Sequence, residues 1–103
     1  MQPREGCREE LVSTFQRLGV PERALKQEGC LSVELQVPVT DDGPVLVTAL
    51  WSHRSAYDGW LSNPWRDEST EVLSPLLAQP PTGLVYDIRV AAGNQLAAAE
   101  VRP

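Results

Sequence analysis

The stretch VLVTALWSHRSAYDGWLSNP, residues 45–64, predicts a strand that runs directly into an amphipathic helix. Its first seven residues are apolar apart from Thr48, so both faces of the strand are expected to be buried. Ser52 can cap the helix, whose apolar residues then share one face: Ala56, Tyr57, Trp60 and Leu61. Proline disfavours helical conformation in the residue before it, so Asn63-Pro64 ends this helix. A strand buried on both faces needs a layer on each side, and in a short chain one layer is expected from a partner or a ligand.

Length and composition bound what the protein can be. With 103 residues, 42% apolar and 22% charged, the chain is expected to fold as one globular domain over 1–103. The formal charge of −5 argues against nucleic acid or an anionic membrane as a partner. The sequence has neither an apolar run of about 18 residues nor a signal-peptide pattern, so a cytoplasmic location is expected.

Few residue types that support metal or nucleophilic catalysis are present. Cys7 and Cys30 lack the spacing of a metal site and are interpreted as buried, reduced thiols, with a disulfide or metal site as the alternative. A single His excludes a His-based metal cluster, and neither a Gly-rich phosphate loop nor a Ser-His-Asp arrangement is recognisable. Neither a metal nor a nucleotide cofactor is therefore indicated by the residues.

Along the chain, the patterns predict the order helix, strand, strand, helix, strand, strand. The elements are a helix over 6–18, a strand over 30–39 joined by a turn at 41–44 to the strand over 45–51, helical pieces over 52–62 and 65–76, a strand over 84–90, and a final apolar run over 96–101. Pro38 cannot donate to a ladder, which predicts that 30–39 is an edge strand. Gly93-Asn94 predicts a tight turn before the last run.

Two motifs carry a resemblance to a known family. Glu28-Gly29-Cys30-Leu31-Ser32, followed by the Trp51-Ser52 and Ala56-Tyr57 pairs and by Leu61-Ser62-Asn63-Pro64, resembles the antibiotic biosynthesis monooxygenase family over roughly residues 4–90. The resemblance implies an α+β fold with a ferredoxin-like, antiparallel four-stranded sheet and helices on one face. It also implies a homodimeric α+β barrel.

The chain departs from this family at its start. The family begins with a strand in the middle of the sheet, whereas here only residues 1–3 precede the first helix. The run 96–101 reads like that missing strand, so we interpret the chain as a circular permutant with its first strand moved to the C-terminus. The alternatives are a frayed tail on a truncated domain, or a strand that fills the sheet of a partner chain.

The resemblance also implies a site. Family members that oxidise aromatic polyketides line their cavity with a Trp and a Tyr at the places of Trp51 and Tyr57. His53 is the one histidine of the chain, and histidine is the residue type most often used for proton transfer near neutral pH, which makes His53 the default proton acceptor. Further substrate contacts are predicted for Trp60, Trp65, Tyr86 and Arg89. The alternatives are that the aromatic residues are core, that His53 is solvated, and that Arg89 is a surface charge.

The expected function is a cofactor-independent monooxygenase that acts on an aromatic, polyketide-like small molecule, of the anthrone or phenol to quinone type. Quinone-forming relatives carry an Asn where this chain has Val47. Haem-degrading relatives carry an Asn on the first strand and a His on a helix, and the corresponding run 96–101 has no Asn, while the single His lies at the strand-to-helix junction. A polyketide cyclase or isomerase, or a non-catalytic ligand-binding barrel, remains as an alternative.

Overall fold

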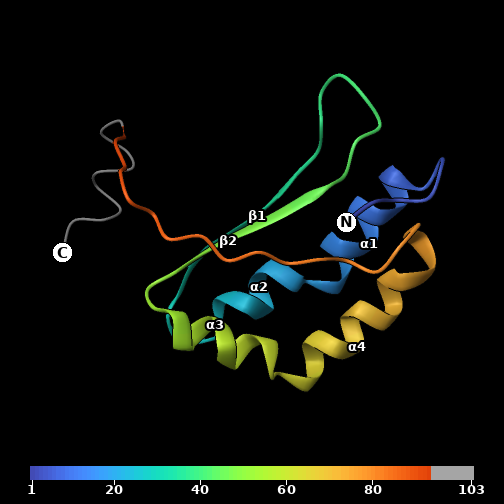
Figure 1. Cartoon of the computed structure of the whole chain (residues 1–103). Coiled ribbons are helices and arrows are strands. Elements are labelled where there is room, and N and C mark those ends of the chain that lie inside the picture. The colour runs from blue at the N-terminus through green and yellow to red at the C-terminus, as the bar shows by residue number, and fades with distance from the viewer. Residues whose placement is uncertain (94–103) are drawn as a thin grey trace.

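The computed structural model describes residues 1–93, and Figure 1 shows how their helices lie against a β-hairpin. The elements in chain order are α1 (Arg8–Leu18), α2 (Val20–Leu25), β1 (Cys30–Gln36), β2 (Leu46–Trp51), α3 (Arg54–Leu61), α4 (Pro64–Leu73) and a 3₁₀ turn (Ser74–Leu76). The predicted α+β arrangement, with an antiparallel sheet and helices, is confirmed.

Local sequence signals explain where most helices begin and end. α1 ends at Gly19, whose φ of 72° lies in the left-handed region that glycine adopts without strain. α4 begins after Asn63, whose side chain accepts a hydrogen bond of 3.0 Å from the Trp65 amide, and Pro64 occupies the first helical position. The break predicted at Asn63-Pro64 is thus confirmed.

The cap of α3 differs from the prediction. His53, and not Ser52, is the capping residue, and its Nδ1 accepts a hydrogen bond of 3.2 Å from the Ala56 amide. The reason is that Ser52, the first residue after β2, is still held beside the start of β1, because its amide donates to the Gly29 carbonyl over 2.8 Å. The helix therefore begins one residue later than the pattern predicts.

β1 and β2 form an antiparallel hairpin. Val33 lies opposite Ala49 and Leu35 opposite Val47, with a bulge between Cys30 and Ser32. Val33 and Leu35 pack against the core, so the odd-numbered residues of β2 share the side of the sheet that faces the helices. The opposite face carries Ser32, Glu34, Gln36, Leu46, Thr48 and Leu50.

In the single chain the strand over 45–51 is only partly covered, and the prediction that a partner or a ligand supplies the second layer stays a prediction. Val45 is fully buried, but Leu46 is 51% exposed and Val47 is 41% exposed. The helices cover one end of the hairpin, and among the described residues no layer covers the second face. The core joins all four helices, the start of β2 and the residues after the 3₁₀ turn: Leu11, Phe15, Val20, Ala24, Val45, Trp60, Leu73 and Leu77.

An arginine from α1 holds the loop of the hairpin. The Arg8 guanidinium donates to the Asp41 carbonyl over 2.9 Å and to the Pro38 carbonyl, and lies 3.9 Å from the Asp42 carboxylate. Within the loop, the Gly43 amide donates to the Asp41 side chain over 2.8 Å. The turn predicted at 41–44 is therefore supported by a contact from outside the hairpin.

The first four residues lie between the start of β2 and the chain after α4. Met1 and Val45 exchange two backbone hydrogen bonds, of 2.7 and 2.8 Å. On the other side Pro3 forms an antiparallel bridge with Leu77, flanked by bonds of 2.8 Å from the Arg4 amide to the Leu76 carbonyl and from the Ala78 amide to the Gln2 carbonyl. Residues 1–4 thus form a short strand-like segment, which we call the N-terminal stub.

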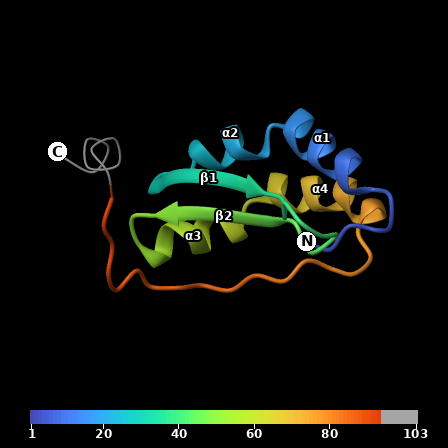
Figure 2. The ribbon, with the colours of Figure 1, turned by 90° about the horizontal axis from the view of Figure 1, so that it is seen from above.

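The strand predicted over 84–90 does not form among the described residues. From residue 81 to 93 the chain is neither helix nor strand, and no backbone hydrogen bond given for residues 1–93 involves 79–93. Figure 2 shows this segment running along the length of the sheet, on the side of β2 remote from β1. Within residues 1–93 it has no adjacent strand to bond with. The strand predicted over 96–101 lies outside the described residues.

Candidate functional site

Trp51 and Tyr57 form an aromatic pair at the junction of β2 and α3. Trp51 is the last residue of β2 and Tyr57 lies in the first turn of α3. Their ring centroids are 5.7 Å apart with an interplanar angle of 53°, a tilted geometry that aromatic rings favour. Both side chains are half-buried and pack against the core. The two residues predicted to line the site are therefore brought together.

Gly29 lets α3 approach the start of β1 closely. Its φ is +89°, and a Cβ built there would lie 2.5 Å from the Ala56 Cβ and 2.9 Å from the Ser52 Oγ. Any side chain would push the first turn of α3 away from the sheet. Gly29 therefore positions Tyr57, a role that sequence reasoning missed although the residue belongs to the motif that carries the family resemblance.

His53 caps α3 from an exposed position. Besides the Ala56 amide, its Nδ1 lies 2.7 Å from the Ser55 Oγ, and its Nε2 faces the backbone at Gly29, 3.5 Å from where a Cβ would stand. An Nδ1 that accepts the amide bond leaves the ring proton of neutral imidazole on Nε2. The lone pair that a proton acceptor would use is thus engaged by the helix in this arrangement.

Trp60 and Trp65 form a second aromatic pair, separate from the first. Their centroids are 6.2 Å apart, and the Arg23 guanidinium lies 4.9 Å from the centre of the Trp65 ring. Trp60 is only 7% exposed and belongs to the core cluster, against which Trp65 also packs. Through Arg23 this pair links α2 to the end of α3 and the start of α4. In the described residues both tryptophans therefore serve packing.

Tyr86 and Arg89 lie on the unpaired segment 79–93 and are exposed. The structure does not bring them to Trp51. The beginning of the same segment does reach the aromatic pair, because a Cβ at Gly83 would lie 3.5 Å from the Tyr57 hydroxyl oxygen. The segment therefore crosses the polar end of Tyr57 before it runs out along the sheet.

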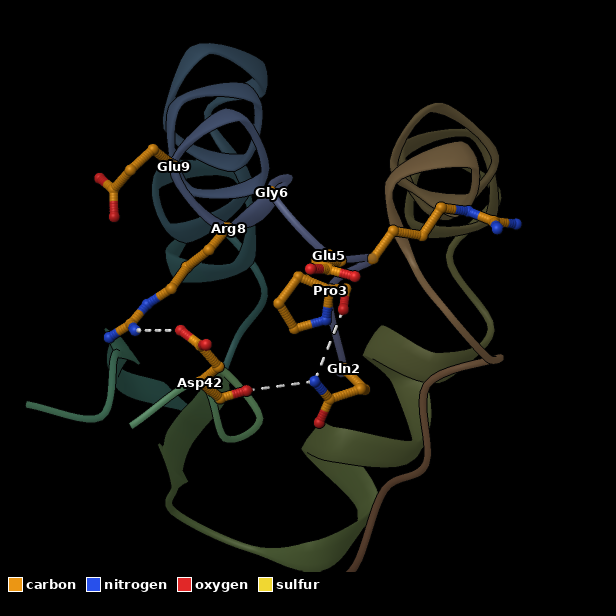
Figure 3. Close-up of a pocket in the computed structure, with 8 residues that line it drawn as sticks. Gln2, Pro3, Glu5, Gly6, Arg8, Glu9 and Asp42 are labelled. Carbon is orange, nitrogen blue, oxygen red and sulfur yellow. Dashed lines mark hydrogen bonds and ion pairs between the residues drawn. The ribbon is translucent and has the colours of Figure 1, made fainter. Parts of the chain in front are cut away.

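Two hollows of the surface lie away from the Trp51–Tyr57 pair. One of about 400 Å³ is bordered by the N-terminal stub, the start of α1 and the hairpin loop, as Figure 3 shows. Most of the residues that line it are polar or charged, with charges of both signs: Gln2, Pro3, Arg4, Glu5, Gly6, Arg8, Glu9 and Asp42. A smaller one, of about 190 Å³, lies beside Phe15 and Leu35. Neither hollow is lined by Trp51 or Tyr57. The aromatic pair therefore lies outside both of them.

Titratable groups in the described part of the chain give no metal site. No cluster of three or more His, Cys, Asp or Glu within residues 1–93 could hold an ion. Cys7 and Cys30 are free thiols, but both are half-buried and not buried as predicted. Burial raises the pKa of the Cys30 thiol above its ordinary value, and a hydrogen bond from the Ser32 backbone opposes this more weakly.

None of the helices within residues 1–93 has the length and apolarity needed to cross a membrane.

Comparison with known families identifies the chain. The antibiotic biosynthesis monooxygenase family model matches residues 1–71, which include the Gly29 junction and the Trp51–Tyr57 pair. The chain belongs to this family. A search of curated proteins found no match. Membership of the antibiotic biosynthesis monooxygenase family supports a cofactor-independent monooxygenase or a related function.

Proposed function

We propose that this protein is a cofactor-independent monooxygenase that converts an aromatic, polyketide-like substrate of the anthrone or phenol class to a quinone. The observation that carries the proposal is the tilted pair of Trp51 and Tyr57 in a chain of the antibiotic biosynthesis monooxygenase family. Tyr57 offers a hydroxyl to a substrate oxygen, and Trp51 offers an apolar face to a flat ring.

The proposed reaction needs no bound redox group. Removal of a proton from the C–H₂ group of an anthrone, or from the hydroxyl of a phenol, leaves an anion whose ring carbon donates its electrons to O₂. The oxygen adds to this carbon as a peroxide, and loss of water then leaves a carbonyl. One atom of O₂ ends in the quinone and the other in water. A hydrogen bond from Tyr57 to the substrate oxygen stabilises the developing negative charge, and more strongly in a cavity that excludes water.

His53 is the proposed proton acceptor. It can serve only if its Nδ1 releases the Ala56 amide, because its present hydrogen bonds place the proton on Nε2. After that release either Nδ1 takes the substrate proton, or the other tautomer forms and Nε2 takes it. Trp60 and Trp65 support the site from the core. Tyr86 and Arg89 are proposed to contact the substrate once the segment over 84–90 is paired into the sheet.

The proposed assembly is a single domain over 1–103 with a four-stranded sheet, whose strands over 84–90 and 96–101 complete the described hairpin. Two copies form a dimeric barrel by covering the exposed sheet face that carries Leu46 and Leu50. The proposed location is the cytoplasm, with neither nucleic acid nor membrane as a partner, in keeping with the formal charge of −5.

Oxygen consumption with an anthrone tests the function. We expect uptake of one O₂ per quinone formed. Tyr57→Phe should lower kcat/KM about 2- to 13-fold, as expected for one lost uncharged hydrogen bond of about 0.5–1.5 kcal/mol. Ser62→Ala is the matched control, because it removes an exposed hydroxyl from the other end of α3. Wild-type turnover in Tyr57→Phe would remove Tyr57 from the site.

Two alternatives make different predictions. A cyclase or isomerase would transform a polyketide without consuming oxygen. A non-catalytic binding barrel would show a thermal shift with polyphenols but no turnover. The absence of Trp51 and Tyr57 from both hollows described above is the observation that keeps a non-catalytic role as the second candidate.

A further inference from the structure

The ring of Tyr57 is held in place, whereas its hydroxyl is not. The ring packs against Trp51, with 5.7 Å between the ring centroids, and against the core. None of the side-chain hydrogen bonds within residues 1–93 involves the Tyr57 hydroxyl. A tyrosine hydroxyl can donate one hydrogen bond and accept others, so a ligand oxygen could use it.

Gly83 is the residue of segment 79–93 that faces this hydroxyl. A Cβ built at Gly83 would lie 3.5 Å from the Tyr57 oxygen, which is an ordinary van der Waals contact. Apart from its neighbours in the chain, this Cβ would meet no other heavy atom of residues 1–93 within 4 Å. The space on this side of the hydroxyl is therefore open because residue 83 lacks a side chain.

The backbone does not require glycine at position 83. Within residues 1–93 the glycines with left-handed backbone are Gly6, Gly19 and Gly29, and Gly83 is not among them. An alanine at 83 would therefore avoid the strain of that region and would make only an ordinary contact with Tyr57. A side chain at this position is expected to change the access to the Tyr57 hydroxyl without disturbing the fold.

The chain that leads to Gly83 is anchored and stiff. The Ala78 amide donates to the Gln2 carbonyl over 2.8 Å, and Pro80-Pro81 fix their own φ angles and restrict the residues before them. Within residues 1–93 the segment 79–93 makes no backbone hydrogen bond. A substitution at 83 therefore breaks no backbone hydrogen bond of the described chain.

We propose that Gly83 determines specificity, because its missing side chain admits the oxygen of a flat phenol or anthrone to the Tyr57 hydroxyl while the ring lies against Trp51. The inference rests on the proposed function for the class of substrate and adds the residue that selects within this class. An oxygen hydrogen-bonded to the hydroxyl lies about 2.7–2.8 Å from it. A Cβ at 3.5 Å from the same hydroxyl would compete for this space.

Binding of 1-naphthol and of naphthalene tests this selection. The two probes share one flat ring system, and only 1-naphthol carries an oxygen. Equilibrium dialysis gives the Kd of each probe for the unmodified chain and for Gly83→Ala. We expect Gly83→Ala to raise the Kd of 1-naphthol about 2- to 13-fold, the range for one lost uncharged hydrogen bond, and to leave the Kd of naphthalene unchanged. The larger side chain in Gly83→Val should raise the Kd of 1-naphthol at least as much.

Thr82→Ala is the control within the same segment. It changes the residue next to Gly83 without adding an atom, so both Kd values should stay as in the unmodified chain. Urea unfolding of Gly83→Ala should give an equal or higher midpoint, because alanine restricts the unfolded chain more than glycine does. A lower midpoint together with weaker binding of both probes would assign Gly83 to the fold and overturn the inference.

A double-mutant cycle tests whether Gly83 acts through the hydroxyl. Tyr57→Phe alone should raise the Kd of 1-naphthol by a factor similar to that of Gly83→Ala, because it removes the hydrogen bond itself. Adding Gly83→Ala to Tyr57→Phe should then change the Kd by less than about twofold, since the two changes remove the same interaction. Multiplication of the two single effects would place the action of residue 83 elsewhere and overturn the inference.

The remaining outcomes separate this inference from the proposed function. An unchanged Kd of 1-naphthol in Gly83→Ala, an equal loss of both probes, or no binding of 1-naphthol to the unmodified chain would overturn the role of Gly83. Selective loss of 1-naphthol in Gly83→Ala would support it even in a chain that consumes no O₂ with an anthrone, and that second result would overturn the oxygenation alone.

Discussion

At the scale of single residues, two glycines with left-handed backbone differ in what surrounds them. Gly29 and Gly6 have φ values of +89° and +77°, but a Cβ would meet Ala56 at Gly29 and nothing within 4 Å at Gly6. Gly6→Ala should therefore cost only the backbone strain of about 1–2 kcal/mol. Gly29→Ala should cost more, because α3 must also move. Urea unfolding of the two variants measures the difference, and equal losses would show that the Gly29 contact adds nothing.

His53 permits a separation of its two roles by substitution. Asn can cap a helix but cannot accept a proton, and Ala can do neither. We expect His53→Ala to lower the free energy of unfolding by about 0.5–2 kcal/mol and His53→Asn to leave it nearly unchanged. If His53 is the proton acceptor, both variants should lose turnover. Full turnover in His53→Asn would assign His53 to the cap alone.

At the scale of secondary structure, α4 depends on the cap that Asn63 provides. The Asn63 side chain satisfies the Trp65 amide, and Pro64 sets the first helical residue. Asn63→Ala should lower the stability by about 1 kcal/mol. Ser74→Ala, at the other end of α4 and exposed, is the control. Thermal unfolding followed by far-UV circular dichroism compares the two, and a larger effect of Ser74→Ala would contradict this account.

The elements that the sequence predicts well are those whose signals are local. The Asn63-Pro64 break, the helix before Gly19 and the hairpin around 41–44 all depend on neighbours in the chain. The predicted cap of α3, Ser52, lies one residue before the observed cap, because the Ser52 amide is bonded to the carbonyl of Gly29, a residue distant in sequence. The strand over 84–90 has the correct alternation, but a strand exists only beside another strand, and no pattern within 84–90 reports whether that neighbour is present.

The candidate site likewise has features that local sequence predicts and features that depend on contacts between distant residues. The Trp51–Tyr57 pair could be predicted because both residues flank one strand-to-helix junction. The core position of Trp60 depends on how α3 and α4 pack, which the amphipathic pattern alone does not distinguish from a cavity lining. The role of Gly29 could have been inferred only from knowing that α3 packs against it.

At the scale of the whole molecule, the exposed sheet face predicts self-association. It carries Leu46 and Leu50 between polar residues, and a specific dimer would bury about 1,200–2,000 Å² in total. Sedimentation at micromolar concentration should give twice the chain mass of 11.3 kDa. Leu50→Lys should shift the protein toward monomer, since it places a charge on this face. A wild-type monomer would contradict the dimeric barrel.

The contact of Arg8 with the hairpin loop has a consequence for the order of folding. The loop carbonyls of Pro38 and Asp41 are held by a side chain from α1, so the turn depends on a helix that is far away in sequence. An isolated two-stranded hairpin is marginal in water. We therefore expect α1 to dock before or together with closure of the hairpin. The rate-limiting barrier would then include this contact, and truncation of Arg8 would slow refolding more than it speeds unfolding.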